Sequence, residues 1–146
     1  MASDKYDCLK LESQLCFPLY VCSKEIVRRY KPYLDELDLT YTQYITMLAL
    51  WEHAPVTVKA LGDLLYLDSN TLTPLLKTLE KKGYLTRTRS KEDERSLILS
   101  LTNAGKQLKR KAVGIPSKMG KCVSLNDADA MELYRILHIM MEQWQD

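Results

Sequence analysis

The sequence predicts a mainly α-helical fold with one small β-ribbon. A helical segment begins at Asp68 and closes at Gly83, and two short β-type stretches follow it directly. These stretches flank a charged tip that ends at Arg95. A helix followed by such a ribbon is the outline of a winged helix-turn-helix, in which the ribbon is the β-wing, and it indicates binding to double-stranded DNA.

The size and composition of the chain agree with one such unit. Its 146 residues fit one domain, and 46% of them are hydrophobic, which is enough for a core. Lys24, Glu25, Arg28 and Arg29 interrupt the first apolar run, so no membrane span is expected. The apolar stripes of the terminal helices lack a basic polar face, so no membrane contact is expected either. The first residues lack the apolar core of a signal peptide, and we expect a cytoplasmic protein.

The cysteines and histidines indicate neither a metal site nor a structural disulfide framework. Paired CxxC or Cys/His spacing is missing, and His53 and His138 are far apart. We therefore expect no metal and no cofactor. The four cysteines are Cys8, Cys16, Cys22 and Cys122.

Positive charge is concentrated in the middle of the chain. Residues 68–111 hold eleven Lys/Arg against five Asp/Glu, a balance of +6. The remaining residues hold ten against fourteen, a balance of −4. A basic middle in an otherwise acidic chain is typical of a protein that binds a polyanion such as DNA.

The first helix is predicted over residues 8–31, where apolar positions stand three and four residues apart. Pro18 lies inside this pattern, so a kink or an irregular first turn is expected there. A short polar connection, residues 33–40, follows. A second helix is expected over residues 41–51, where Thr40 is the N-cap and forms a capping box with Gln43. A third is expected over residues 58–65 after an N-cap at Thr57. A fourth is expected over residues 69–82, with Asp68 or Ser69 as its N-cap.

The wing strands follow a predicted left-handed C-cap at Gly83. They are expected at Tyr84–Thr88 and Leu97–Leu101, because leucines alternate with other residues in the second stretch. Beyond the wing, Thr102 is expected to cap a long helix through about Met119. The C-terminal predictions are a break or bend in this helix near residues 114–116 and a last helix over Asp127–Gln145.

The helices at both ends of the chain carry wide apolar stripes that the winged-helix part does not need for its own core. A second subunit is the economical way to bury them, so we expect a homodimer. Within the single domain, residues of about 1–35 and 103–146 would form the dimerisation helices, and residues of about 40–102 the DNA-binding part.

The predicted DNA contacts come from the helix after Asp68 and from the wing. The short polar residues that begin this helix suit base edges in the major groove, although N-capping alone explains Asp68 or Ser69. Arg95 is expected to enter the minor groove, held by a carboxylate–guanidinium pair with Asp93; a solvated turn is the alternative. The polar residues are Asp68, Ser69, Asn70, Thr71 and Thr73, and the side chains expected at phosphates are Lys77, Lys81, Arg87 and Arg89.

Two sets of motifs carry a family resemblance. The wing reads Asp93-Glu-Arg95-Ser-Leu-Ile-Leu-Ser-Leu-Thr102 and is followed by Ala-Gly105, with an Asp-x-Arg core and a Leu-Thr-x-x-Gly ending. It resembles the wing of the MarR family of dimeric winged-helix regulators. The resemblance implies a repressor of pseudo-palindromic operators that a small molecule or an oxidant releases.

The second set runs through the N-terminal half. It comprises Lys10-Leu-Glu-Ser-Gln-Leu-Cys16-Phe, Tyr20, Tyr30-Lys-Pro, Leu39-Thr-Tyr41-x-Gln-Tyr44, Leu50-Trp-Glu-His53 and Tyr66-Leu-Asp68-Ser. Here the chain resembles the OhrR-like branch, which senses organic hydroperoxides, and the related staphylococcal thiol-based regulators. The resemblance implies that Cys16 is the peroxide-reactive cysteine. It also implies that the partner subunit's Tyr30 and Tyr41 bond to its sulfur, with Tyr20 nearby.

The chemistry of peroxides agrees with a role for Cys16. A peroxide reacts with a thiolate, and an ordinary cysteine, with a pKa of about 8.5, is mostly thiol at neutral pH. Phenol hydroxyls that donate to sulfur favour the thiolate, and the chain has nine tyrosines against one phenylalanine. Leu15, Phe17 and Leu19 would form an apolar rim that suits an organic peroxide. The plain alternative is a core cysteine on a helix stripe.

The other cysteines receive different interpretations. In two-cysteine members of the resembled branch a resolving cysteine stands late in the chain, about where Cys122 falls. The resemblance therefore makes an intersubunit Cys16–Cys122 disulfide a hypothesis, and its formation would be reversible. Cys8 and Cys22 are interpreted as packing residues.

These features predict a homodimeric repressor that releases operator DNA when an organic hydroperoxide or a related oxidant reversibly oxidises Cys16. One alternative keeps the regulator but makes the trigger a phenolic or aromatic ligand in the dimer crevice. A second alternative is a thiol peroxidase. The wing argues against it and no second catalytic group is visible, so no catalytic residue is assigned and no enzyme is expected.

Overall fold

The computed structural model describes residues 3–145, so Met1 and Ala2 of the predicted N-terminal dimerisation segment and Asp146 of the C-terminal one lie outside the described residues. The predicted fold class is confirmed, since the molecule is mainly helical with a small antiparallel sheet. In chain order the elements are the 3-10 turns η1 (Asp7–Leu9) and η2 (Leu11–Ser13), α1 (Cys16–Asp35), α2 (Tyr41–His53), β1 (Val56–Thr57), α3 (Val58–Leu65), α4 (Ser69–Lys81), β2 (Leu85–Arg89), β3 (Leu97–Leu101), α5 (Asn103–Ala112), α6 (Ile115–Val123) and α7 (Asp127–Glu142).

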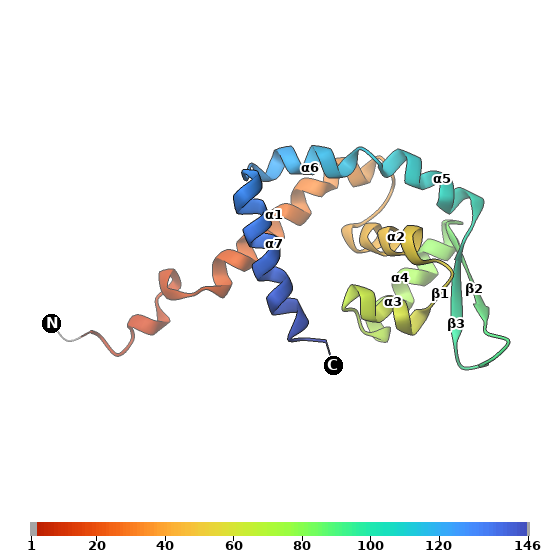
Figure 1. Ribbon diagram of the computed structural model, residues 1–146, viewed down its shortest axis with the longest axis horizontal. Helices are drawn as coiled ribbons and strands as arrows, with labels where there is room; N and C mark the ends of the chain where they lie inside the picture. The colour runs from red at the N-terminus through yellow and green to blue at the C-terminus, as the bar shows by residue number, and fades with distance from the viewer. Residues whose placement is uncertain (1–2, 146) are drawn as a thin grey trace.

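Helices α2, α3 and α4 and the three strands form a winged-helix body, which lies beneath the arch of α5 and α6 in Figure 1. The predicted leucine stripe of α4 is confirmed, because all four of its leucines are buried in the shared core. Burial of these side chains fixes which face of α4 stays in solvent. The stripe consists of Leu72, Leu75, Leu76 and Leu79, and it packs with Met47, Leu50, Leu61, Leu85 and Leu99.

The sheet has one strand more than expected. Its order is β1-β3-β2, with both pairs antiparallel, and Val56 of β1 stands opposite Leu99 of β3. A two-residue strand is too short to show an alternating pattern, so only its pairing with β3 reveals it. This pairing ties the base of the wing to the start of α3.

Local capping signals at the helix starts are confirmed. Thr40 and Gln43 form the predicted capping box, in which Gln43 N donates to Thr40 Oγ1 (3.2 Å) and Thr40 N to Gln43 Oε1 (3.0 Å). Asp68, rather than Ser69, caps α4. Gly83 has the predicted left-handed conformation, with φ of +87°. The two remaining caps, Thr57 at α3 and Thr102 at α5, also accept from the backbone N–H three residues later.

The N-terminal prediction was wrong at both ends of the first helix. Residues 8–13 lie mainly in two 3-10 turns, which the Gln14 side chain holds by donating to Cys8 O (2.8 Å) and Lys10 O (2.7 Å). The helix itself begins at Cys16, so Pro18 lies in its first turn, where a missing N–H costs no hydrogen bond. It then continues through Pro32 to Asp35, so only residues 33–35 of the expected connection 33–40 are helical.

The C-terminal helices differ from the prediction in their ends. The break predicted near residues 114–116 is confirmed, because α5 ends at Ala112 and α6 begins at Ile115. The second of these helices runs to Val123, beyond the predicted end at Met119. The last helix ends at Glu142, three residues before the prediction.

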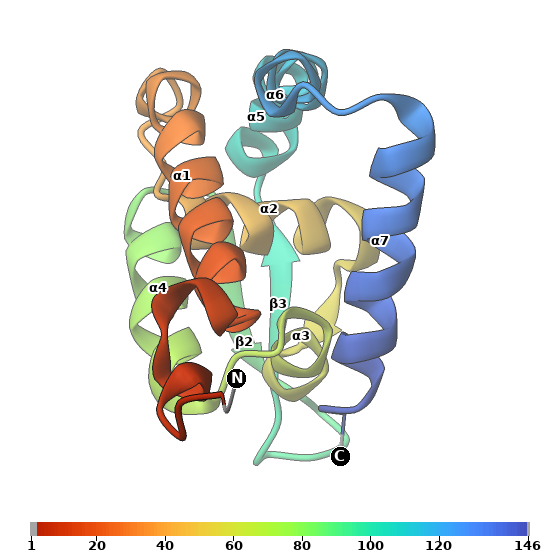
Figure 2. The same cartoon turned by 90° about the vertical axis from the view of Figure 1, so that its left-hand side faces the viewer.

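Large apolar side chains remain exposed on the N-terminal half of α1 and on α7. No residue of α7 is buried, and Leu15, just before α1, is 83% exposed. Figure 1 places both helices on the same side of the winged-helix body, and in Figure 2, viewed from that side, they stand apart, with α1 at the left and α7 at the right. Apolar surface of this extent on one chain is typical of an interaction site.

Among residues 3–145, none of the helices combines the length and apolar character needed to cross a bilayer.

Candidate nucleic-acid interface and cysteine site

The start of α4 presents polar side chains to solvent, as the sequence predicted. Ser69, Asn70 and Thr71 are exposed and Thr73 is half-buried. Asp68 has a structural task, because its Oδ1 accepts a hydrogen bond from Thr71 N (2.8 Å). The exposed residues are therefore free to meet base edges, whereas Asp68 orients them.

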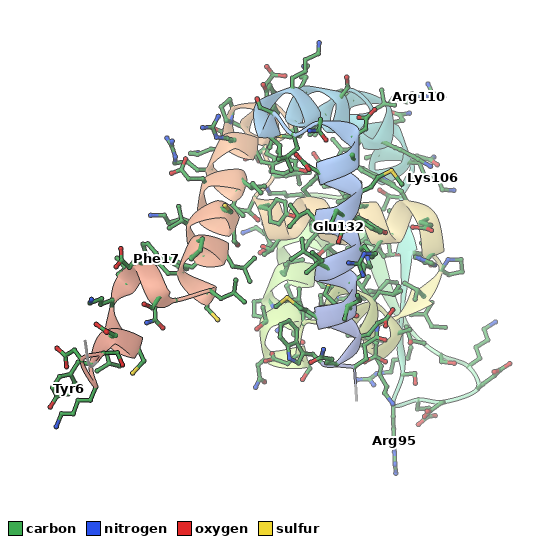
Figure 3. The ribbon with its side chains drawn as sticks, turned by 60° about the vertical axis from the view of Figure 1, so that its left-hand side comes forward. Tyr6, Phe17, Arg95, Lys106, Arg110 and Glu132 are labelled. Carbon is green, nitrogen blue, oxygen red and sulfur yellow. The ribbon has the colours of Figure 1, made fainter. Side chains whose placement is uncertain are left out.

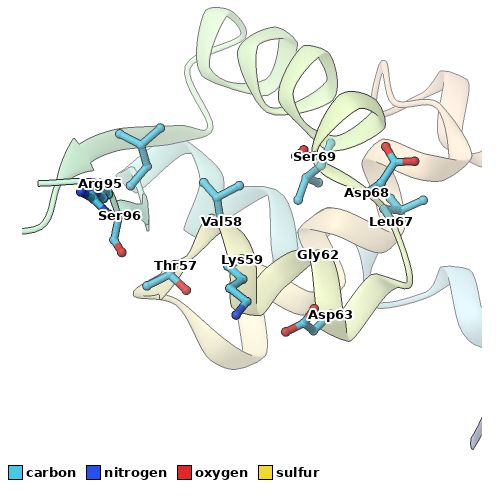
Figure 4. A pocket seen from close by; sticks show the side chains of 12 residues that line it. Thr57, Val58, Lys59, Gly62, Asp63, Leu67, Asp68, Ser69, Arg95 and Ser96 are labelled. Carbon is cyan, nitrogen blue, oxygen red and sulfur yellow. The ribbon is translucent and has the colours of Figure 1, made fainter. Parts of the chain in front are cut away.

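A cleft of about 480 Å³ lies between α3, the start of α4 and the tip end of the wing at residues 95–97. Figure 4 shows its walls, with Lys59 and Asp63 on α3, Asp68 and Ser69 at α4, and Arg95 on the wing. Lys59 was not among the predicted DNA contacts, because it stands before the basic window 68–111, yet it lines the same cleft as Arg95. Only the packing of α3 against α4 brings it there.

The wing tip differs from the predicted arrangement. Asp93 does not pair with the Arg95 guanidinium; its Oδ1 accepts from Arg95 N (3.0 Å) and its Oδ2 from Ser96 Oγ (3.3 Å). A carboxylate two residues away in a tight turn reaches the backbone more easily than a long side chain. Figure 3 shows the Arg95 side chain pointing away from the body of the molecule. Among the described residues no side chain pairs with this guanidinium, so it is available to DNA.

Two of the four cations expected at phosphates have partners within the chain. Arg87 Nη2 donates to Glu80 Oε1 (3.0 Å), and the hydrogen bond from Arg87 holds the pKa of Glu80 below its usual value. Arg89 Nη1 donates to Glu94 O (2.8 Å) across the wing. Lys77 and Lys81 are exposed on α4, and neither takes part in an ion pair within residues 3–145. Arg87 therefore joins the wing to α4, and the two lysines are better placed for phosphates.

Cys16 is the first residue of α1 and is exposed in the single chain. No side chain caps this end of the helix, and the N-terminal end of a helix favours negative charge. Tyr20 lies one turn further along α1 and is 62% exposed. The thiol therefore stands where a peroxide can reach it, on the helix whose apolar face is uncovered.

Three tyrosine rings meet where α1 crosses α2. The ring centroids of Tyr30 and Tyr41 are 5.0 Å apart, and Tyr44 lies 5.6 Å from Tyr30. Burial raises the pKa of Tyr30 to about 12 and also raises that of Tyr41. Both phenols are thus protonated at neutral pH and can donate to an acceptor such as a thiolate.

Cys16 cannot reach these tyrosines within one chain. Fourteen residues of α1 separate Cys16 from Tyr30, which is about 21 Å of straight helix. The structure therefore brings Tyr30 and Tyr41 together but not with Cys16. A phenol–sulfur contact requires a second chain, as the sequence prediction assumed.

Cys122 lies in the last turn of α6, half-buried against α1. The Tyr33 hydroxyl is 3.8 Å from its sulfur, and this hydrogen bond raises the pKa of Tyr33. Since Tyr33 stands seventeen residues after Cys16 on α1, the two sulfurs are about 25 Å apart in one chain. A disulfide needs α-carbons within about 7 Å, so Cys16 and Cys122 could pair only between subunits.

The remaining cysteines do not fit their predicted role. Cys8 and Cys22 are both exposed, so neither packs in the core of a single chain. All four cysteines are free thiols. Among residues 3–145, no three His, Cys, Asp or Glu side chains are grouped so that they could hold a metal ion.

Comparison with known sequences supplies the family context. Residues 28–112 match the family described as transcriptional regulator SarA/Rot. The chain is 50% identical over 139 residues to the organic hydroperoxide resistance transcriptional regulator of Bacillus subtilis (strain 168), covering 95% of each protein. It is 48% identical over 127 residues to the HTH-type transcriptional regulator SarZ of Staphylococcus saprophyticus, covering 87% of each.

Comparison with solved structures agrees. The chain is similar to reduced AbfR bound to DNA, with a TM-score of 0.79 and 33% identity, over 98% of this chain and 100% of that one. It is also similar to AbfR with a disulfide formed, with a TM-score of 0.66 and 36% identity, over 94% and 96% of the two chains. AbfR is a protein of Staphylococcus epidermidis.

Proposed function

The chain belongs to the SarA/Rot family of winged-helix transcriptional regulators, and from this premise we propose that it is a dimeric redox-sensing repressor whose sensor is Cys16. It is a regulator and not an enzyme. The observation that carries the proposal is the 50% identity, over nearly the whole chain, to a regulator of organic hydroperoxide resistance. The exposed thiol at the start of α1 supplies the matching chemistry.

The sensing step oxidises one sulfur. The Cys16 thiolate attacks the terminal oxygen of the hydroperoxide, and the O–O bond breaks. The organic fragment leaves as an alkoxide, takes up a proton and becomes an alcohol, while Cys16 becomes a sulfenic acid. The partner subunit's Tyr30 and Tyr41 would donate to the sulfur and favour its thiolate form, with Tyr20 beside it.

The dimer would be held by the helices whose apolar faces are uncovered in one chain. These are α1 and α7, with α5 and α6 as the connection to the wing. The residues of about 1–35 and 103–146 thus form the dimerisation part of one domain, and residues of about 40–102 bind DNA. Two α4 helices would enter successive major grooves about one turn apart.

The DNA contacts divide by chemistry. Ser69, Asn70, Thr71 and Thr73 would meet base edges, and Lys77 and Lys81 phosphates. Arg95 would enter the minor groove at the flank of each half-site. Arg87, Arg89, Asp68 and Asp93 hold α4 and the wing in shape rather than contact DNA directly.

A gel shift on DNA from upstream of the protein's own gene tests the function. The reduced protein should retard the DNA, and cumene hydroperoxide should release it, with recovery after dithiothreitol. Release by an aromatic ligand in the absence of any peroxide, with no response to peroxide, would instead support a ligand-gated repressor. Steady consumption of peroxide with a thiol reductant and no DNA binding would indicate a peroxidase.

An Arg95→Ala variant should weaken operator binding about tenfold or more, because one charge-assisted contact of about 1.5–3 kcal/mol is lost. Fluorescence anisotropy at several salt concentrations measures the effect. Arg87→Ala is the matched control: since Arg87 pairs with Glu80, its loss should lower thermal stability and change the salt dependence little. Equal losses of affinity in both variants would contradict this division of roles.

A Cys122→Ser variant tests the resolving role. If Cys122 resolves the sulfenic acid, its thiol attacks the oxidised sulfur of the partner subunit's Cys16, a disulfide forms and water leaves. Wild-type protein treated with cumene hydroperoxide should then run as a linked dimer in non-reducing electrophoresis, and the variant as a monomer. A dimer that persists in Cys122→Ser, or none in the wild type, rules out this pairing.

A further inference from the structure

Lys82 makes a directed contact between two distant parts of the chain. It is the C-cap residue of α4, and its Nζ donates to the backbone oxygen of Asp38. The same Nζ lies 3.4 Å from Gln43 Oε1 and 3.4 Å from Asp38 Oδ2. The Lys82 side chain is only 25% exposed, whereas the neighbouring Lys81 is exposed. The half-buried Lys82 thus bonds to groups of its own chain, whereas Lys81 faces solvent.

The acceptors of Lys82 belong to the first turn of α2 and to the turn between α1 and α2. Leu34, Leu37 and Leu39 anchor this turn in the core, and Asp38 between them has a positive φ of 54°. Gln43 Oε1 also accepts from Thr40 N (3.0 Å) as part of the capping box of α2. The Lys82 ammonium therefore joins three element ends: the last turn of α4, the end of α1 and the start of α2.

The hydrogen bond of Lys82 differs in kind from the apolar packing that holds the rest of α4 to the core. Its leucines pack by apolar burial, which is non-directional and tolerates small rotations. A hydrogen bond to a main-chain oxygen in a fixed turn specifies direction as well as distance. A positive charge at a helix C-terminus also offsets the helix dipole, but Lys81 supplies that in solvent.

Helix α1 connects this contact to the cysteine. Cys16 is its first residue, and the Lys82 acceptor lies three residues after its last. We propose that Lys82 is a positioning residue of the redox switch: it holds the recognition helix α4 to the end of α1, so that displacement of α1 after oxidation of Cys16 turns α4 away from its half-site. This inference rests on the proposed function and adds the route by which sensor and DNA-binding helix are coupled.

The test compares oxidised and reduced protein rather than affinity alone. In the wild type, the ratio of operator Kd after and before cumene hydroperoxide measures the coupling, which for allosteric proteins is commonly 5–150-fold. Lys82→Met keeps the aliphatic stem and removes the donor, and it should bring the ratio close to one. Lys82→Arg keeps a donor and should restore most of the ratio.

Two controls separate the contact from charge and from folding. Asp38→Asn keeps the main-chain acceptor and tolerates positive φ, so its ratio should match the wild type. Lys106→Met removes an exposed cation of α5 and should also leave the ratio unchanged. If Lys82→Met does not fold, Lys82→Gln, too short to reach Asp38 but polar, takes its place.

The outcomes are distinct. A wild-type protein that shows no difference between oxidised and reduced affinity overturns the proposed function itself. A wild type that responds, together with a Lys82 variant whose oxidised and reduced affinities fall by the same factor, leaves the function standing. That second result overturns the positioning role, because Lys82 would then only support the fold.

Discussion

A Cys16→Ser variant is expected to bind operator DNA as tightly as the wild type and to remain bound after treatment with cumene hydroperoxide. Serine is nearly isosteric with cysteine, and Cys16 is exposed at the start of α1, so the substitution creates no cavity and no buried polar group. A hydroxyl does not form a sulfenic acid, so the response should be lost completely rather than reduced. Gel shifts of variant and wild type at the same peroxide concentrations measure both the operator affinity and the release of DNA by peroxide.

The chain offers its own controls for this experiment. Cys8 and Cys22 are exposed on the same N-terminal segment, so Cys8→Ser and Cys22→Ser change thiols of similar accessibility. Both variants should release DNA as the wild type does. If Cys16→Ser still releases DNA when peroxide is added, the sensor lies elsewhere. A ligand in the dimer crevice then becomes the better explanation of the regulation.

A Gly105→Ala variant is expected to lose about 3 kcal/mol or more of unfolding free energy, which corresponds to a drop in Tm of roughly 10 °C. A Cβ at this position would lie 2.1 Å from Tyr84 O and 3.2 Å from Leu101 Cδ2. The obstacle is main chain, so it cannot move without shifting the wing. Thermal unfolding by circular dichroism gives the size of the effect.

Gly105 stands at the junction of three elements, so the loss should extend to DNA binding. Thr102 N donates to Tyr84 O (3.1 Å), Gly105 N to Thr102 Oγ1 (3.0 Å), and Trp51 Nε1 to Gly105 O (2.8 Å). These bonds join α2, the wing and α5, and an added methyl group would strain all of them. The wing would then be displaced relative to α4.

Gly120→Ala is the matched control for this substitution. Apart from the neighbouring backbone of α6 itself, no heavy atom of residues 3–145 lies within 4 Å of the Cβ position at Gly120, in the middle of this helix. Alanine favours a helix by up to about 1 kcal/mol over glycine, so this variant should keep or gain stability. A Gly105→Ala variant as stable as Gly120→Ala would contradict the close approach of Gly105 to Tyr84.

Much of the DNA-binding part was predictable because its signals are local. Thr40, Thr57, Asp68 and Thr102 each bind a backbone N–H only three residues away, so a short stretch of sequence contains both partners. The leucine stripe of α4 depends on the helical period alone. The wing strands and the turn at Gly83 followed from similar short-range rules.

The predictions from sequence were wrong where a short-range pattern suggested a helix or a contact but the packing partner or the geometry of the fold did not support it. Residues 8–15 have helical spacing, yet Leu9, Leu11 and Leu15 find nothing to bury against within one chain, and 3-10 turns form instead. Asp93 was expected to hold the Arg95 guanidinium, but the tight turn places the backbone N–H nearer. The positions of charged residues in the sequence could not show which arginine side chain is paired within the protein and which is available to DNA.

The sequence by itself determined the helix starts, the α4 stripe and the presence of a wing, because neighbours along the chain decide these features. Only the tertiary structure decided that Arg87 pairs with Glu80. It also decided that Trp51 and Lys82 donate hydrogen bonds to backbone oxygens 54 and 44 residues away. Such pairs depend on how whole helices pack, which no local pattern records. The length of α1 keeps Cys16 about 21 Å from Tyr30, so the complete cysteine site requires a second chain.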